Sequence, residues 1–104
     1  MIVVHFGFGM NGPWGEEMSN TLDGLAHDIN NTEGLVWKIW TENEKEGRAG
    51  GIYLFEDGQS AENYISMHSA RVSQMGATDI SVDRYSVNEP LSLINRAQLT
   101  ARPA

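Results

Sequence analysis

The runs LVWKIWTE at residues 35–42 and AGGIYLFE at residues 49–56 give the strongest indication of the fold. Both runs are rich in the β-branched and aromatic side chains that favour strands. The charged segment between them ends near Gly47 and is typical of a solvent-exposed turn. The spacing therefore predicts an antiparallel hairpin.

A strand and a helix are predicted before this hairpin. Residues 2–8 are rich in Ile, Val and Phe, which indicates a strand. The turn at residues 11–13 ends in proline, a residue favoured at the first position of a helix. Apolar residues then recur at helical spacing at Met18, Leu22, Leu25, Ala26 and Ile29. We expect one helix here, terminated by residues 30–34.

A second helix is predicted after the hairpin. It is expected to begin between Asp57 and Ser60 and to end at Gly76, where glycine favours termination. One face of this helix is apolar apart from a histidine and comprises Ala61, Tyr64, Ile65, His68, Val72 and Met75.

Residues 78–88 are predicted to form a fourth strand. Its apolar phase changes near Asp83 and Arg84, which predicts a bulge or a change of packing layer at that point. The apolar tail at residues 89–94 contains Pro90, and we expect it to dock as a short helical or extended arm.

The resulting order, βαββαβ, is the ferredoxin-like split βαβ pattern of α+β proteins. It predicts a four-stranded antiparallel sheet with both helices on one face. The length of 104 residues leaves room for one core, so residues 1–104 are expected to form a single domain.

The second strand predicts an oligomer. Its alternation places Leu35, Trp37 and Ile39 on one side and Val36 and Trp40 on the other, so both sides are apolar. The two helices can cover only one face of the sheet. We therefore expect a homodimer in which the other face packs on a second copy, as in a dimeric α+β barrel.

Composition excludes several classes of function. Seven Lys and Arg against fourteen Asp and Glu give a net charge of -7, which would repel a nucleic acid backbone. No run of apolar residues is long enough to predict a membrane span, and no signal peptide is recognised, so we expect a cytoplasmic protein. Cysteine is absent, and the histidines and carboxylates lack metal-ligand spacing, so neither a metal nor a cofactor is predicted.

Two residues of the second predicted helix are candidates for catalysis. His68 lies in line with Ile65 and Val72 and should point toward the sheet, where an imidazole could take a proton from a phenol-like substrate. Arg71, one turn later, could stabilise an oxyanion, as could Asn11. The alternative is that His68 is a core-edge histidine bonded to a backbone carbonyl and that Arg71 pairs with a surface carboxylate.

Aromatic residues are concentrated on the hairpin and near the helix starts, where they could line a pocket for a flat ligand. The alternative is that they only fill the core. His5 lies on the same side of the first strand as Val3 and Gly7, where Gly7 leaves open space, and could line a cavity. The candidate substrate-binding residues are His5, Asn11, Trp14, Trp37, Trp40, Tyr53 and Tyr64.

Several motifs in their order resemble the YdhR-like putative monooxygenase family. They are NGPWG at residues 11–15, GLVWKIWTE at 34–42, AGGIYLF at 49–55, HSAR at 68–71 and VNEPLS at 87–92. The resemblance covers nearly the whole chain and implies a dimeric α+β barrel. It also implies oxygenation of a small aromatic substrate, and it carries no residue role that can be transferred to this chain.

Triplet oxygen reacts without a cofactor only when the substrate is electron-rich, so such a site needs a base and a dry pocket. We therefore expect a cofactor-independent monooxygenase that oxidises a quinol-type or other small aromatic substrate with O2. Two alternatives remain. One is a haem-binding or haem-degrading enzyme of the same superfamily, with His68 on the iron. The other is a dimeric module that binds a small hydrophobic ligand without turnover.

Overall fold

The computed structural model describes residues 1–100 and confirms the predicted order of elements. The sheet has the order β2-β3-β1-β4, with neighbouring strands antiparallel, which is the ferredoxin-like arrangement. Its elements are β1 (Ile2–Gly9), α1 (Gly15–Thr21), α2 (Asp23–Ile29), β2 (Leu35–Asn43), β3 (Arg48–Phe55), α3 (Gly58–Gln74), β4 (Thr78–Ser86) and α4 (Glu89–Ile94).

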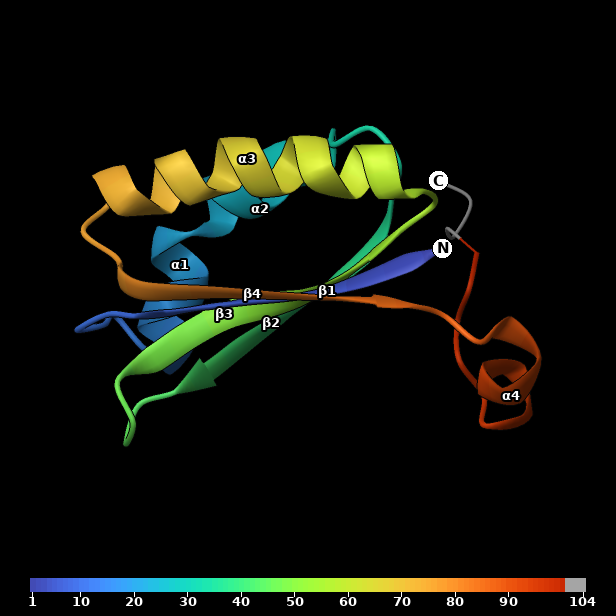
Figure 1. Ribbon diagram of the computed structural model, residues 1–104. Helices are drawn as coiled ribbons and strands as arrows, with labels where there is room; N and C mark the ends of the chain where they lie inside the picture. Colours follow the sequence, from blue (N-terminus) through green and yellow to red (C-terminus); the bar gives the residue numbers. More distant parts are fainter. Residues whose placement is uncertain (101–104) are drawn as a thin grey trace.

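The sheet separates two unequal layers. Figure 1 shows α3 lying along one face with α2 beside it, whereas α4 lies on the other side of the sheet, beyond the end of β4. The Asp57 side chain caps α3 by accepting a hydrogen bond from the Ser60 amide at 2.7 Å. Asn88 caps α4 in the same way, so the tail is a short helix as expected. No helix within residues 1–100 combines the length and the apolar character that crossing a membrane requires.

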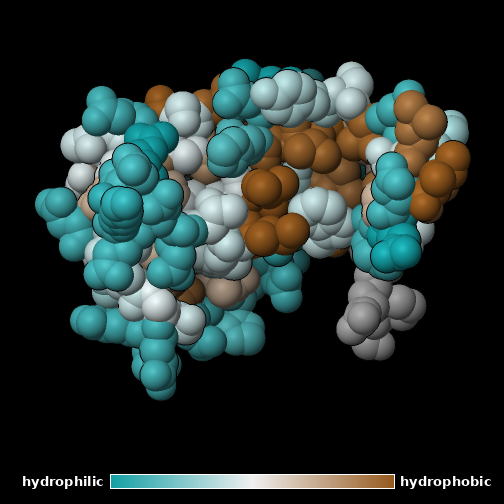
Figure 2. Space-filling view, turned by 90° about the horizontal axis from the view of Figure 1, so that it is seen from below, coloured by the Kyte–Doolittle hydropathy of each residue, from teal (hydrophilic) through white to brown (hydrophobic). Residues whose placement is uncertain are grey.

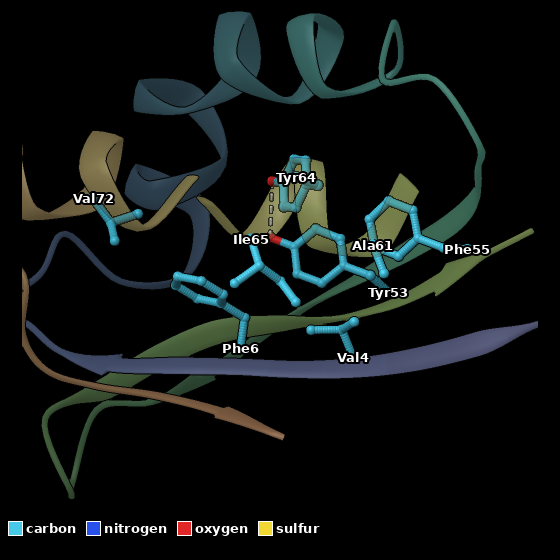
Figure 3. Packing of buried hydrophobic residues seen from close by; sticks show 8 residues of the cluster. All are labelled: Val4, Phe6, Tyr53, Phe55, Ala61, Tyr64, Ile65 and Val72. Carbon is cyan, nitrogen blue, oxygen red and sulfur yellow. Dashed lines mark hydrogen bonds between the residues drawn. The ribbon is translucent and has the colours of Figure 1, made fainter. Parts of the chain in front are cut away.

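The core lies between the sheet and α3. Register pairs Val4 with Tyr53, and strand alternation then sends Val4, Phe6, Tyr53 and Phe55 to the same face. The helical residues Ala61, Tyr64, Ile65 and Val72 pack against them (Figure 3). Phe6 and Phe55 are fully buried, so the sheet is held to α3 chiefly by large side chains.

The prediction of one helix before the hairpin is wrong in detail. Leu22 adopts φ -102° and ψ 10°, outside the α-helical region, and this residue separates α1 from α2. Helix α1 also begins at Gly15, after Trp14 in extended backbone, rather than at Pro13. The apolar residues still face inward, because the two short helices bury Met18 and Ile29.

The predicted faces of β2 also need correction. The ladder with β3 shifts register between Leu35 and Trp37, so these two residues do not share a face. Leu35 packs against the core, whereas Trp37 pairs with Leu54 on the opposite face. Lys38 and Trp40 therefore join Tyr53 on the helix-covered face.

No bulge occurs at Asp83 and Arg84, because their pairing with β1 is regular. The irregularity in this ladder lies between Gly7 and Gly9, opposite the start of β4, where Asp79 has a φ of 48°. The change of apolar phase instead records a change of face, from Val82 against the core to Tyr85, which is 60% exposed.

Candidate functional site

A cavity of about 440 Å³ lies between the sheet and the helices. Its floor is formed by β-strand residues, including Phe8, Trp40 and Tyr53, and its helical walls include Leu22, Leu25 and Val72. The segment Met10–Pro13 lines it as well. The surface is mostly apolar and the volume suits a small aromatic molecule.

The polar groups of the cavity include His68, which is 3% exposed. Arg71 approaches Nδ1 of this ring with Nε at 3.2 Å and Nη2 at 3.0 Å, and its Nη1 donates to Asp28 Oδ2 at 3.0 Å. A guanidinium can only donate, so Nδ1 must be an acceptor and the hydrogen of the neutral ring lies on Nε2. Any hydrogen bond that the neutral ring donates must therefore come from Nε2.

This protonation state is enforced by the surroundings of the ring. Burial, together with the positive charges of Lys38 and Arg71, lowers the pKa of His68 to about 3. Phe6 and Tyr64 pack on the ring, with centroids 5.0 and 4.8 Å away. The imidazole is therefore neutral at physiological pH and fixed in orientation.

Lys38 is the charged residue of the cavity lining. Its Nζ lies 3.4 Å from the ring centroid of Trp40 and 4.7 Å from that of Tyr53, which are cation–π distances. Burial, followed by the charge of Arg71, lowers the pKa of Lys38 to about 7. A substantial fraction of this amine is therefore neutral near pH 7.

Two tyrosine hydroxyls meet beside the cavity. Tyr64 donates to the hydroxyl of Tyr53 at 3.2 Å, as Figure 3 shows. Burial raises the pKa of both phenols, so both stay protonated. Tyr53 lines the cavity and Tyr64 supports it from behind.

The structure brings together some of the residues that the sequence suggested. Asn11, Trp40, Tyr53 and His68 line the cavity. Arg71 and Tyr64 contact cavity residues from the side of α3. The idea that Arg71 pairs with a surface carboxylate is also correct, since it contacts both Asp28 and His68.

Three other candidates lie elsewhere. His5 is exposed and pairs with Ile52 on the opposite face of the sheet, because its neighbours Val4 and Phe6 fill the core. Trp37 lies on that opposite face too, where its Nε1 donates to the Gln98 carbonyl at 2.6 Å. Trp14 borders a separate, more open pocket with Glu17 and Glu42.

Sequence reasoning missed Lys38 and Asp28. Lys38 lies in a strand of apolar and aromatic residues and has no predicted role, and the ladder with β3 shows that it shares a face with Tyr53. Asp28 meets Arg71 across 43 positions of the chain, a contact without a local signal. Within residues 1–100 no group of three or more His, Asp or Glu residues is placed to hold a metal ion.

The sheet order, with α2 and α3 on one face and an apolar cavity between them and the sheet, defines an α+β protein of the ferredoxin-like class. The model of the family described as "Putative mono-oxygenase ydhR" matches residues 2–98, so the chain belongs to this family. No curated protein matches the chain.

A likeness to a solved structure agrees with this class. The crystal structure of a "putative antibiotic biosynthesis monooxygenase" from Deinococcus radiodurans superposes with a TM-score of 0.59 over 85% of this chain and 93% of that chain. The two sequences are 11% identical, so the likeness concerns the fold.

Proposed function

We propose that this protein is a cofactor-independent monooxygenase that oxidises a small phenol- or quinol-type substrate with O2. The observation that carries the proposal is the apolar cavity of about 440 Å³ with Lys38, Tyr53 and His68 on its lining. The match to a family described as mono-oxygenases supports the reaction class. The apolar walls keep water from a reactive oxygen intermediate.

The chemistry requires no external reductant. A phenol that is oxidised to a quinone gives four electrons to O2; one oxygen atom becomes the new ring carbonyl, and the other leaves as water with the two hydrogens lost by the substrate. The reaction with O2 is faster when the phenol is first converted to its electron-rich anion. Nε2–H of His68 can donate to that anionic oxygen, a role in which Arg71 acts by fixing the tautomer.

Oxygen uptake with a panel of quinols and phenols tests the proposal. We expect the wild type to consume oxygen and His68→Phe to be slowed about 100-fold, because the ring volume is kept and the donor is lost. His27→Gln is the matched control, since His27 is an exposed histidine of α2, with a side chain 77% accessible. Uptake no faster than in protein-free solution contradicts the proposal and favours a binding module.

We also propose that the protein works as a homodimer. The face of the sheet away from the helices carries exposed Ile39 and Tyr85, and α4 adds Leu91, Leu93 and Ile94. Figure 2 shows hydrophobic side chains gathered in the middle of this face and on one side of it. Burying them against a second copy would remove a large apolar surface from water.

Ile39→Glu is expected to weaken the dimer at least about tenfold, because it places a charge in an apolar interface. Sedimentation equilibrium at micromolar concentration measures the dissociation constant. Met67→Glu, at an exposed position of α3 on the other face of the sheet, is the control and should leave the dissociation constant unchanged. A wild-type protein that sediments as a monomer contradicts the proposed dimer.

A further inference from the structure

The charge of the cavity is opposite to that of the protein. The chain has fourteen Asp and Glu residues and a net charge of -7. The residues that line the cavity include no carboxylate, and Lys38 is the residue among them that can carry a full positive charge at neutral pH. An anion therefore meets no like charge on this lining, whereas a cation would meet the ammonium group.

The fold makes room for the Lys38 side chain. Gly51 of β3 lies beside it, and a Cβ at Gly51 would come within 2.7 Å of Lys38 Cε. The missing side chain at Gly51 leaves space for the aliphatic stem of Lys38, whose Nζ lies within cation–π distance of both Trp40 and Tyr53. No carboxylate within residues 1–100 forms an ion pair with Lys38. Among the described residues, the amine is thus held in the cavity without a carboxylate counter-ion.

We propose that Lys38 is the proton acceptor of this site, and that the ligand is an aromatic hydroxyl compound that binds as its anion. In the step, the ligand O–H bond breaks, the proton forms a bond with the Nζ lone pair, and a phenolate paired with an ammonium group results. The step is a proton transfer only, and neither the ligand nor Lys38 is oxidised or reduced. The inference rests on the proposed function, because it identifies the base and the substrate class of the same cavity.

The other groups that face Lys38 are unsuited to this role. His68 of α3 has its acceptor nitrogen occupied by Arg71, and Tyr53 of β3 is a phenol whose pKa burial raises. Arg71 of α3 is charged and paired with Asp28 of α2. The residues of α1 and β1 on the lining are Met18, Thr21 and Phe8, none of which titrates. The pKa of Lys38, lowered to about 7, suits an acceptor near neutral pH.

Binding of 4-nitrophenol tests the inference without any oxygen chemistry, because its phenolate is yellow and its neutral form is colourless. We expect the wild type to hold it as the yellow phenolate at a pH at which most of the free compound is neutral. Lys38→Met is expected to weaken binding at least about tenfold, the loss of a charge-assisted contact. 4-Nitroanisole, which has no proton to give, is the matched ligand and should bind both proteins alike.

Lys38→Arg separates a proton acceptor from a simple charge. A guanidinium stays protonated, so affinity for 4-nitrophenol should rise with pH and then level off. In the wild type, affinity should fall again above about pH 7, because Lys38 itself then loses its proton. A merely structural lysine would not produce this difference in pH profile.

The outcomes separate this inference from the proposed function. Phenolate binding that depends on Lys38, without oxygen uptake, supports the proton transfer and contradicts the monooxygenase. Oxygen uptake that survives in Lys38→Met, or a bound 4-nitrophenol that stays colourless, overturns the role of Lys38 and leaves the monooxygenase standing. Failure of the wild type to bind either probe also overturns the inference.

Discussion

Gly50→Ala is expected to lower the free energy of unfolding by about 3 kcal/mol, the upper part of the range for overpacking. A Cβ at Gly50 would lie 1.9 Å from the Phe6 carbonyl oxygen and 2.9 Å from Gly7 Cα. Both are backbone atoms of β1, so no side-chain rotation relieves the clash. The central pair of strands, which carries much of the core and one wall of the cavity, would have to separate.

Urea denaturation measures this effect as a fall in midpoint with an unchanged slope. Gly24→Ala is the matched control, because a Cβ there meets nothing within 4 Å and the residue lies in α2. That substitution should raise the free energy of unfolding by about 0.5–1 kcal/mol. Equal stability of the two variants would show that β1 and β3 can adjust, contrary to the packing described.

Most of the fold could be predicted because its signals are local. The hairpin and helix α3 each depend on neighbours a few residues apart, and both are confirmed. The tail, expected as a helical or an extended arm, is helical. Leu22 was less predictable. It fits the apolar stripe of one helix, and only the backbone geometry shows that the chain turns there to form α1 and α2.

The site was harder to predict because it depends on ladder register. One irregularity between Leu35 and Trp37 decides which aromatic residues of β2 face the helices. Simple alternation would keep Leu35 and Trp37 together and gives no reason to single out Lys38. The contact of Arg71 with Asp28 and the fit of Lys38 beside Gly51 are likewise products of tertiary structure.

The same buried cavity holds two basic side chains, His68 and Lys38, whose pKa values differ. The positive charges of Lys38 and Arg71 disfavour protonation of His68, and that of Arg71 disfavours protonation of Lys38. The ring, which has the lower pKa, is neutral throughout the physiological range. Its neutrality is a condition both for hydrogen-bond donation from Nε2 alone and for the stability of the fold.

Acid is therefore expected to destabilise the protein through His68. In the unfolded chain its pKa returns to its ordinary value of 6.5, whereas in the folded protein it is about 3. Between these values the unfolded state binds a proton that the folded state does not. The stability due to the neutral ring is complete above pH 6.5 and is lost as the pH falls toward 3. Between pH 6.5 and 4 the loss is about 3 kcal/mol.

The contribution of His68 can be separated from that of the carboxylates by difference. His68→Phe keeps an aromatic ring against Phe6 and Tyr64. Between pH 6.5 and 4 we expect its free energy of unfolding to fall by about 3 kcal/mol less than that of the wild type. Carboxylates titrate in both proteins and cancel. His27→Gln, at an exposed histidine, should follow the wild type. If the free energy of unfolding depended on pH in the same way in wild type and His68→Phe, the folded protein would accept a proton on His68. The ring would then be free to act as a base.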